Sequence, residues 1–139
     1  MSPQSRRAAG ILLVVLPTVI FGGVSLLSLL LSPQSGYMNN PLRQNLWRAG
    51  HAHAGVFLVL SLVALRYVDE AILPDRAKNL VRWLLPSSAI LLPAAFFLSV
   101  LSPNATEPNA LVYLAYVGAV ALATSLVILG VGLLRKVRT

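Results

Sequence analysis

Two histidines, His51 and His53, are the residues of this chain best suited to binding chemistry. They are its only histidines, and they lie in the segment 48–55, Arg-Ala-Gly-His-Ala-His-Ala-Gly, which opens a long apolar run. An imidazole loses its water in an apolar environment and needs a polar partner there. The pair therefore predicts either a ligand or metal site, or histidines that hydrogen-bond between helices.

The two-residue spacing argues against a metal chelate formed by one helix. Each helical residue turns about 100°, so the two rings are about 200° apart and point to nearly opposite faces. Ligand pairs that share a helix face are three or four residues apart. Three arrangements stay open: one ring faces the bundle core and the other a loop or a second copy, the helix is irregular near Gly50, or each ring serves a different ligand.

Small residues beside both imidazoles leave room for a bulky planar ligand such as haem, whose iron is most often held by an axial histidine. The start of a helix disfavours imidazolium and so favours the neutral, ligating ring. Arg43 and Arg48 lie at the same end and are candidates to pair with haem propionates or another anion. Tyr116 is the best candidate partner for a histidine. We therefore expect haem b or a transition metal at His51 and His53.

The segment 48–55 also resembles the His-x-His region of the catalytic subunits of the haem–copper oxidase and nitric oxide reductase superfamily. In that family a histidine of the second helix is an axial ligand of a low-spin haem, so the resemblance implies this role for His51 or His53. The chain has far fewer apolar runs than the family and lacks the histidines that bind the second haem and the copper. The resemblance therefore implies a haem-binding remnant and excludes a full oxidase site.

The composition places these residues in a membrane. Of the 139 residues, 57% are hydrophobic and 11% are charged, whereas soluble domains have about 45–50% and about 25%. The net charge is +7, but the bases lie at the ends of apolar runs, which indicates orientation in a lipid bilayer and no nucleic-acid partner. The chain has no cysteine, which excludes disulfides, thiolate metal sites and cysteine nucleophiles.

Four apolar runs are long enough to cross a hydrocarbon core of about 30 Å, which takes about 20 residues. They cover residues 9–31, 49–68, 83–101 and 110–134 of a single transmembrane domain. Short loops make successive helices antiparallel neighbours. The sequence therefore predicts an all-α, up-down bundle of four transmembrane helices. Asn40 as N-cap and Pro41 as first helical residue predict that the second helix starts ahead of the membrane.

The distribution of Lys and Arg predicts the orientation of the four spans. If the N-terminus is cytoplasmic, only Arg43 and Arg48 lie outside, and the other nine of the eleven bases lie inside. The nine are Arg6, Arg7, Arg66, Arg76, Lys78, Arg82, Arg135, Lys136 and Arg138. An excess of bases on the cytoplasmic side is the usual rule. We therefore expect both termini in the cytoplasm and the histidine pair on the external or periplasmic side of the plasma membrane.

Acidic residues indicate little further chemistry. The four runs contain no Asp, Glu or Lys, so a proton-relay transporter or an ion pump is not supported. Asp69 and Glu70 are adjacent at a helix end, where Arg66 can pair with one of them in a solvated ion pair of small energetic weight. No catalytic residue is predicted, and the sequence does not decide whether the protein is an enzyme.

These observations predict a small polytopic membrane protein that binds haem or a metal near the outer leaflet, for electron transfer or gas sensing. We expect it to form a homo-oligomer or to join a partner membrane subunit. One alternative is a non-catalytic accessory or scaffold subunit, whose polar residues only fix helix contacts. Another is an oligomeric channel or small-molecule carrier in which Pro93 bends a pore-lining helix.

Overall fold

The computed structural model describes residues 1–135, which form helices and connecting loops with no strand. The main helices are α1 (Pro3–Leu31), α2 (Pro41–Val68), α3 (Asp75–Leu98) and α4 (Leu114–Leu134). Short 3-10 helices at Pro33–Ser35 and Tyr37–Asn39 precede α2, and a third at Ala110–Tyr113 leads into α4. Four helices are long and apolar enough to cross a membrane, which confirms this part of the prediction. Lys136 and Arg138, used in the charge count, lie outside the described residues.

Local capping explains where α1 and α2 begin. Asn40 is the N-cap of α2: its side-chain oxygen accepts a hydrogen bond from the Arg43 amide at 3.1 Å, and Pro41 occupies the first turn. The predicted start of this helix is therefore confirmed. Ser2 caps α1 in the same way and accepts a hydrogen bond from the Ser5 amide at 3.2 Å. Such caps satisfy amides that the helix itself leaves unpaired.

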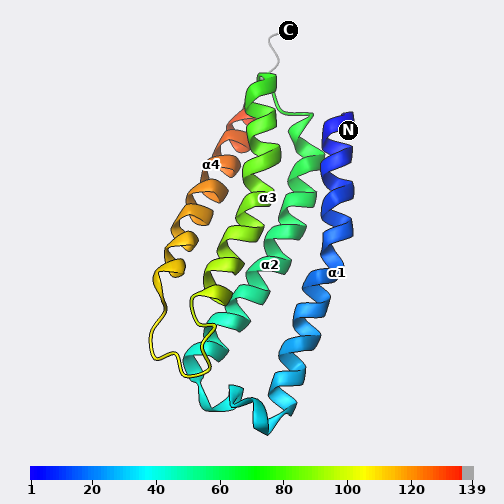
Figure 1. Cartoon of the computed structure of the whole chain (residues 1–139). Helices are drawn as coiled ribbons and strands as arrows, with labels where there is room; N and C mark the ends of the chain where they lie inside the picture. Colours follow the sequence, from blue (N-terminus) through cyan, green and yellow to red (C-terminus); the bar gives the residue numbers. More distant parts are fainter. Residues whose placement is uncertain (136–139) are drawn as a thin grey trace.

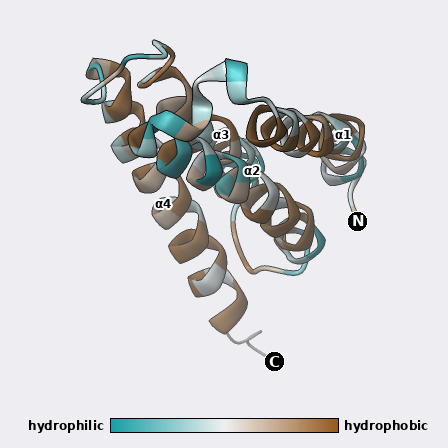
Figure 2. Ribbon diagram, turned by 90° about the horizontal axis from the view of Figure 1, so that it is seen from below, coloured by the Kyte–Doolittle hydropathy of each residue, from teal (hydrophilic) through white to brown (hydrophobic). Residues whose placement is uncertain are grey.

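The four helices stand side by side in chain order, each antiparallel to the next (Figure 1). α2 packs between α1 and α3, and α3 packs between α2 and α4, whereas the described residues of α1 and α4 do not touch each other. Viewed along the helices, α1 and α4 lie at opposite edges of the row (Figure 2). The bundle is therefore open, and each edge helix has a large face without a protein neighbour.

The two ends of the row differ in what they carry. We call the end with loops 32–40 and 99–109 the histidine end, because both histidines lie in the half of α2 nearer to it. The opposite end holds residues 1–2, the loop 69–74 and the last turn of α4. We call it the terminal end.

Glycines allow neighbouring helices to approach closely at two places. A Cβ atom added to Gly50 of α2 would lie 3.0 Å from the ring of Phe97 on α3. A Cβ atom added to Gly118 of α4 would lie 3.1 Å from the backbone nitrogen of Leu92 on α3. Both separations are shorter than an ordinary contact between such atoms. Close approach through small residues is the usual basis of helix association in lipid.

The buried core is small, and the outer surface is strongly apolar. One cluster joins α2, α3 and α4, and another joins α1 to α2 through Leu12, Leu58 and Leu65. On α1, Val14 and Phe21 are 79% and 73% exposed. A soluble monomer rarely exposes large contiguous apolar surfaces, so these faces suit contact with lipid. The first cluster consists of Ala64, Val68, Ala71, Val81, Leu85 and Leu129.

Candidate functional site

α2 directs its two histidines toward different neighbours. The ring of His51 lies against Gly22 and Gly23 of α1. The ring of His53 lies at an angle to Phe96 of α3, with the ring centroids 5.4 Å apart. α2 is one continuous α-helix between Pro41 and Val68. The imidazoles therefore diverge as their spacing predicts, and they do not meet at a common ligand within one chain.

His51 occupies a notch formed by two glycines of α1. A Cβ atom added to Gly23 would lie 3.0 Å from Nε2 of His51, and one added to Gly22 would lie 3.6 Å from Nδ1. The imidazole thus fills the space that the missing side chains leave. Because α1 is in contact with both ring nitrogens, an iron atom with its porphyrin does not fit at Nε2 without displacing this helix. In this arrangement His51 acts as a packing residue between α1 and α2.

His53 has the hydrogen bond that prepares an imidazole for ligation. Its Nδ1 lies 2.7 Å from the carbonyl oxygen of Ala49, one turn earlier on α2. A carbonyl oxygen only accepts, so the hydrogen bond requires a proton on Nδ1, and in the neutral ring the lone pair is then on Nε2. Phe57 lies beside the same ring, with centroids 5.2 Å apart. A ligating histidine commonly donates its other N–H to a carbonyl in this way, which holds its tautomer and orientation.

Arg43 is bound by the protein itself. Its side chain is buried, Nε donates to the Val100 carbonyl oxygen at 3.1 Å, and Nη2 donates to that of Leu101 at 3.4 Å. The guanidinium also lies over the ring of Trp47, 4.2 Å from its centroid. These carbonyls directly follow α3, whose C-terminus attracts a cation. Arg43 therefore fastens α2 to the end of α3, and its donors point into the protein rather than toward an external anion.

Arg48 and Tyr116 lie apart from the imidazoles. Arg48 is exposed, and its Nε donates to the Gln44 carbonyl oxygen of the same helix at 3.1 Å. Tyr116 is 71% exposed on α4 and stacks on Tyr113, with ring centroids 6.2 Å apart. Among the described residues, no hydrogen bond or ring contact joins Tyr116 to a histidine. The structure therefore does not bring this predicted partner to the site.

An aromatic cluster at the histidine end has no signal in the sequence. Tyr37 is fully buried and stacks on Trp47 at 5.8 Å, and Trp47 in turn contacts Phe97 at 6.1 Å. Burial raises the pKa of Tyr37, and the charges of Arg48 and Arg43 offset this only in part. Trp47 Nε1 donates to the Phe97 carbonyl oxygen, fifty residues away along the chain. Sequence patterns do not anticipate contacts of this range.

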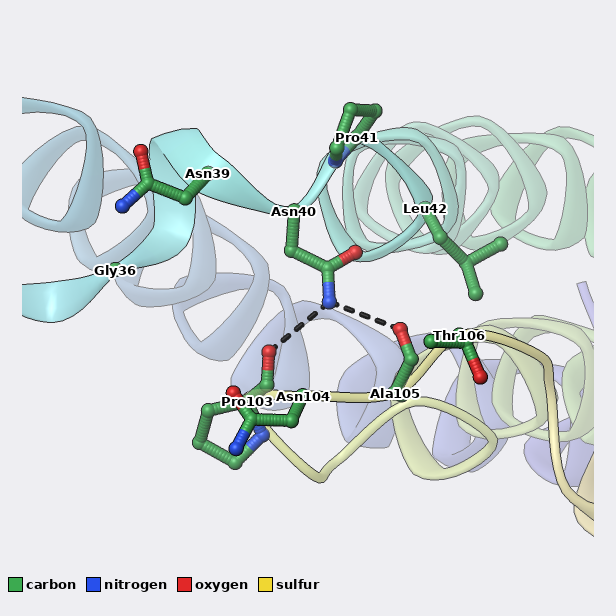
Figure 3. Close-up of a pocket in the computed structure, with 9 residues that line it drawn as sticks. All are labelled: Gly36, Asn39, Asn40, Pro41, Leu42, Pro103, Asn104, Ala105 and Thr106. Atoms are coloured by element: carbon green, nitrogen blue, oxygen red, sulfur yellow. Dashed lines mark hydrogen bonds between the residues drawn. The ribbon is translucent and has the colours of Figure 1, made fainter.

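Asn40 ties the two loops of the histidine end together. Its side-chain nitrogen donates to the carbonyl oxygens of Pro103 and Ala105, both at 3.0 Å (Figure 3). A cleft of about 550 Å³ opens between these loops, and every residue that lines it is uncharged. The cleft offers amide and hydroxyl groups but no titratable group, so it does not indicate a reaction.

A buried ion pair holds the terminal end together. Arg82 Nη2 donates to Asp69 Oδ1 at 2.7 Å, with side chains 9% and 19% exposed. The Ser5 hydroxyl links both: it donates to Asp69 Oδ1 at 3.1 Å and accepts from Arg82 Nε at 2.9 Å. The Ser2 amide donates to Asp69 Oδ2 at 2.6 Å. Burial alone would raise the pKa of Asp69, but hydrogen bonds from Ser2, Arg82 and Ser5 outweigh it and hold that pKa well below its usual value.

Arg66 pairs with one of the two adjacent acids, as predicted. It lies 3.6 Å from Glu70, and both side chains are more than half exposed. Such pairs contribute little. Sequence reasoning missed the stronger pair, because Asp69 bonds to an arginine on the next helix rather than to its neighbour on α2.

The two predicted ligands, a metal ion and haem, need different numbers of protein side chains. Within residues 1–135, no three His, Cys, Asp or Glu side chains are grouped closely enough to bind a metal ion. A metal held by protein ligands alone needs about four of them, or about three with water. Haem brings four nitrogens of its own and needs only axial side chains. Of the two predicted ligands, haem is therefore the one that a single imidazole nitrogen can suit.

No protein-family model, curated protein or solved structure matches this chain. A helical bundle is also compatible with many activities. The functional conclusion therefore depends on the chemistry of His53 and its surroundings.

Proposed function

We propose that this protein is an integral protein of the plasma membrane that binds haem b through Nε2 of His53. The observation that supports the proposal is the 2.7 Å hydrogen bond between His53 Nδ1 and the Ala49 carbonyl oxygen, which holds the ring in place and, in the neutral ring, gives Nε2 the lone pair. Phe57 and Phe96 beside the ring provide apolar surface suited to a porphyrin. The resemblance of segment 48–55 to a haem-ligating helix points in the same direction.

One imidazole per chain defines two uses for such a haem. If His53 of one chain alone held the haem, the group would suit binding of a small gas. If His53 residues from two copies held it together, it would suit electron transfer. By the charge distribution, the haem lies toward the external side of the membrane. Arg48 is exposed at this end and, among the described residues, hydrogen-bonds only to Gln44 and Asn45 of its own helix. Because Arg43 is buried, Arg48 is the candidate partner of a propionate.

The proposal is tested by an optical titration of the purified protein in detergent with haem. The wild-type protein is expected to develop a Soret band with saturation at one haem per chain or per two chains. His53→Ala removes the band because the axial ligand is lost, and added imidazole restores it. His51→Ala is the matched control: it keeps the band, because His51 packs against α1 and does not ligate.

Two results would overturn the proposal. One is a wild-type protein that stays colourless at saturating haem. The other is a His53→Ala variant with the same band and affinity as the wild type.

A second candidate is a non-catalytic accessory subunit. The fit of His51 against Gly22 and Gly23 favours it, because this contact accounts for a membrane histidine without any ligand. A colourless protein whose α1–α2 contact weakens in His51→Ala would support this function. The channel or carrier alternative has no such support, since Pro93 is buried within α3.

A further inference from the structure

A cleft of about 450 Å³ lies between α1 and α3 at the terminal end, away from the histidines. Residues nearest the helix starts are polar: Gln4 and Arg7 line it from α1, and Asn79 lines it from α3. Deeper along the helices the lining includes Ile11 on α1 and Trp83 and Pro86 on α3. The cleft is therefore amphipathic along its length.

Along both α1 and α3, the residues that line the cleft change from polar to apolar in the same direction. α1 and α3 are parallel, because they are alternate helices of an up-down row, and both begin at the terminal end (Figure 1). From Gln4 to Ile11, and from Asn79 to Pro86, each helix advances by about 10 Å at 1.5 Å per residue. That depth matches the passage from the headgroup layer into the hydrocarbon.

The cleft carries an uncompensated positive charge. Arg82, which also lines the cleft, is paired with Asp69, and it donates further hydrogen bonds to Ser5, Asn79 and Ser2. Arg7 is exposed, belongs to neither ion pair of the described residues, and has no acidic residue beside it in the lining. An anion at the mouth of this cleft would therefore meet one free guanidinium.

We propose that this cleft binds one anionic phospholipid. Arg7 binds the phosphate, the amides of Gln4 and Asn79 donate to its oxygens, and one acyl chain follows Ile11 and Pro86. Basic pockets between transmembrane helices on the cytoplasmic side bind anionic headgroups. Trp83 is 73% exposed and is the first residue of the apolar run 83–101, and tryptophan is favoured where headgroup and hydrocarbon meet. A free phosphate would contact only the polar end of the cleft, whereas the lipid contacts the cleft along its whole length.

The test is fluorescence quenching of Trp83 in reconstituted vesicles, in a Trp47→Phe background that leaves Trp83 as the only tryptophan. Dibrominated phosphatidylglycerol or dibrominated phosphatidylcholine is mixed into a phosphatidylcholine host. The anionic lipid is expected to quench Trp83 at a lower mole fraction than the zwitterionic lipid. Arg7→Gln abolishes this preference. Inorganic phosphate in excess does not reverse the quenching.

Arg6→Gln is the matched control, because Arg6 has the same charge and exposure as Arg7 but does not line the cleft. It is expected to keep the preference. Native mass spectrometry of the otherwise unaltered chain gives a second readout: one retained phosphatidylglycerol in wild type and Arg6→Gln, and none in Arg7→Gln. Equal quenching by both lipids, or equal loss in Arg6→Gln and Arg7→Gln, would show only diffuse attraction and overturn the proposal.

Discussion

At the residue scale, Asp69 holds three helices together at the terminal end. Its carboxylate receives donors from Ser2, Ser5 and Arg82, so one charge joins the start of α1, the end of α2 and the second turn of α3. Burying a charge is costly, and the cost is offset only when hydrogen bonds satisfy it. Removing the carboxylate leaves Arg82 without a counter-ion in a largely buried position.

We expect Asp69→Asn to lower the free energy of unfolding by about 3 kcal/mol, because it breaks a buried pair and leaves one partner uncompensated. Glu70→Gln is the control, since its ion pair with Arg66 is exposed, and it should change the stability by less than about 0.5 kcal/mol. Detergent-induced unfolding followed by circular dichroism measures both. Equal effects of the two substitutions would contradict the assigned role of Asp69.

The depressed pKa of Asp69 also sets the sign of a pH effect. In the unfolded chain the carboxyl has the ordinary pKa of 3.8, and in the folded protein it lies lower. The contribution to stability is therefore complete above pH 3.8 and is lost as the pH falls below it. Wild-type stability should decline in this acidic range, whereas Asp69→Asn should lose this component of the decline.

Packing of the helices depends on glycine where backbones are close. α3 and α4 meet at Gly118, where a Cβ atom would press on the Leu92 backbone nitrogen at 3.1 Å and on its side chain at 3.0 Å. A backbone atom cannot move aside as a flexible side chain can. Gly130 on the same helix has no heavy atom within 4 Å of an added Cβ. Alanine substitutions at these two glycines therefore distinguish the effect of helix packing from the effect of helix propensity.

We expect Gly118→Ala to destabilise the protein by about 1–3 kcal/mol through overpacking between α3 and α4. Gly130→Ala should be neutral or stabilising by about 0.5–1 kcal/mol, because alanine favours the helix and meets open space. The same unfolding assay compares the two variants. A stable Gly118→Ala variant would mean that α4 does not approach α3 as closely as the structure shows.

The sequence predicts where the helices lie along the chain better than it predicts which helices pack against each other. Apolar runs and the Asn40–Pro41 start signal depend on local chemistry, and α2 begins where that signal predicts. Chain order also makes consecutive helices adjacent. The open arrangement of the row could not be predicted in this way. Whether α1 packs against α4 depends on which helix faces fit best, and no local sequence pattern encodes that fit. The expected meeting of Tyr116 with a histidine does not occur, because Tyr116 is exposed on α4 and stacks on Tyr113.

The whole molecule has one basic end and one with few charges, and this asymmetry predicts its orientation. The terminal end is expected in the cytoplasm and the histidine end outside. The chain has no cysteine, so single introduced cysteines report topology without background. Asn104→Cys should react with a membrane-impermeant maleimide in intact cells, and Glu70→Cys only after permeabilisation. The reverse labelling pattern would place the histidines on the cytoplasmic side.

The sequence by itself determined that this protein has four apolar helices, where α2 starts, and that its two histidines diverge. Each of these follows from hydrophobic run length, capping chemistry and the helical repeat, which are local properties. Only the tertiary structure decided which helix each histidine contacts and which ring bonds a carbonyl oxygen of its own helix. His51 fits against the glycines of α1, whereas His53 bonds its own helix and lies beside Phe96. That distinction depends on which helix packs against each face of α2, and residues distant in sequence set it.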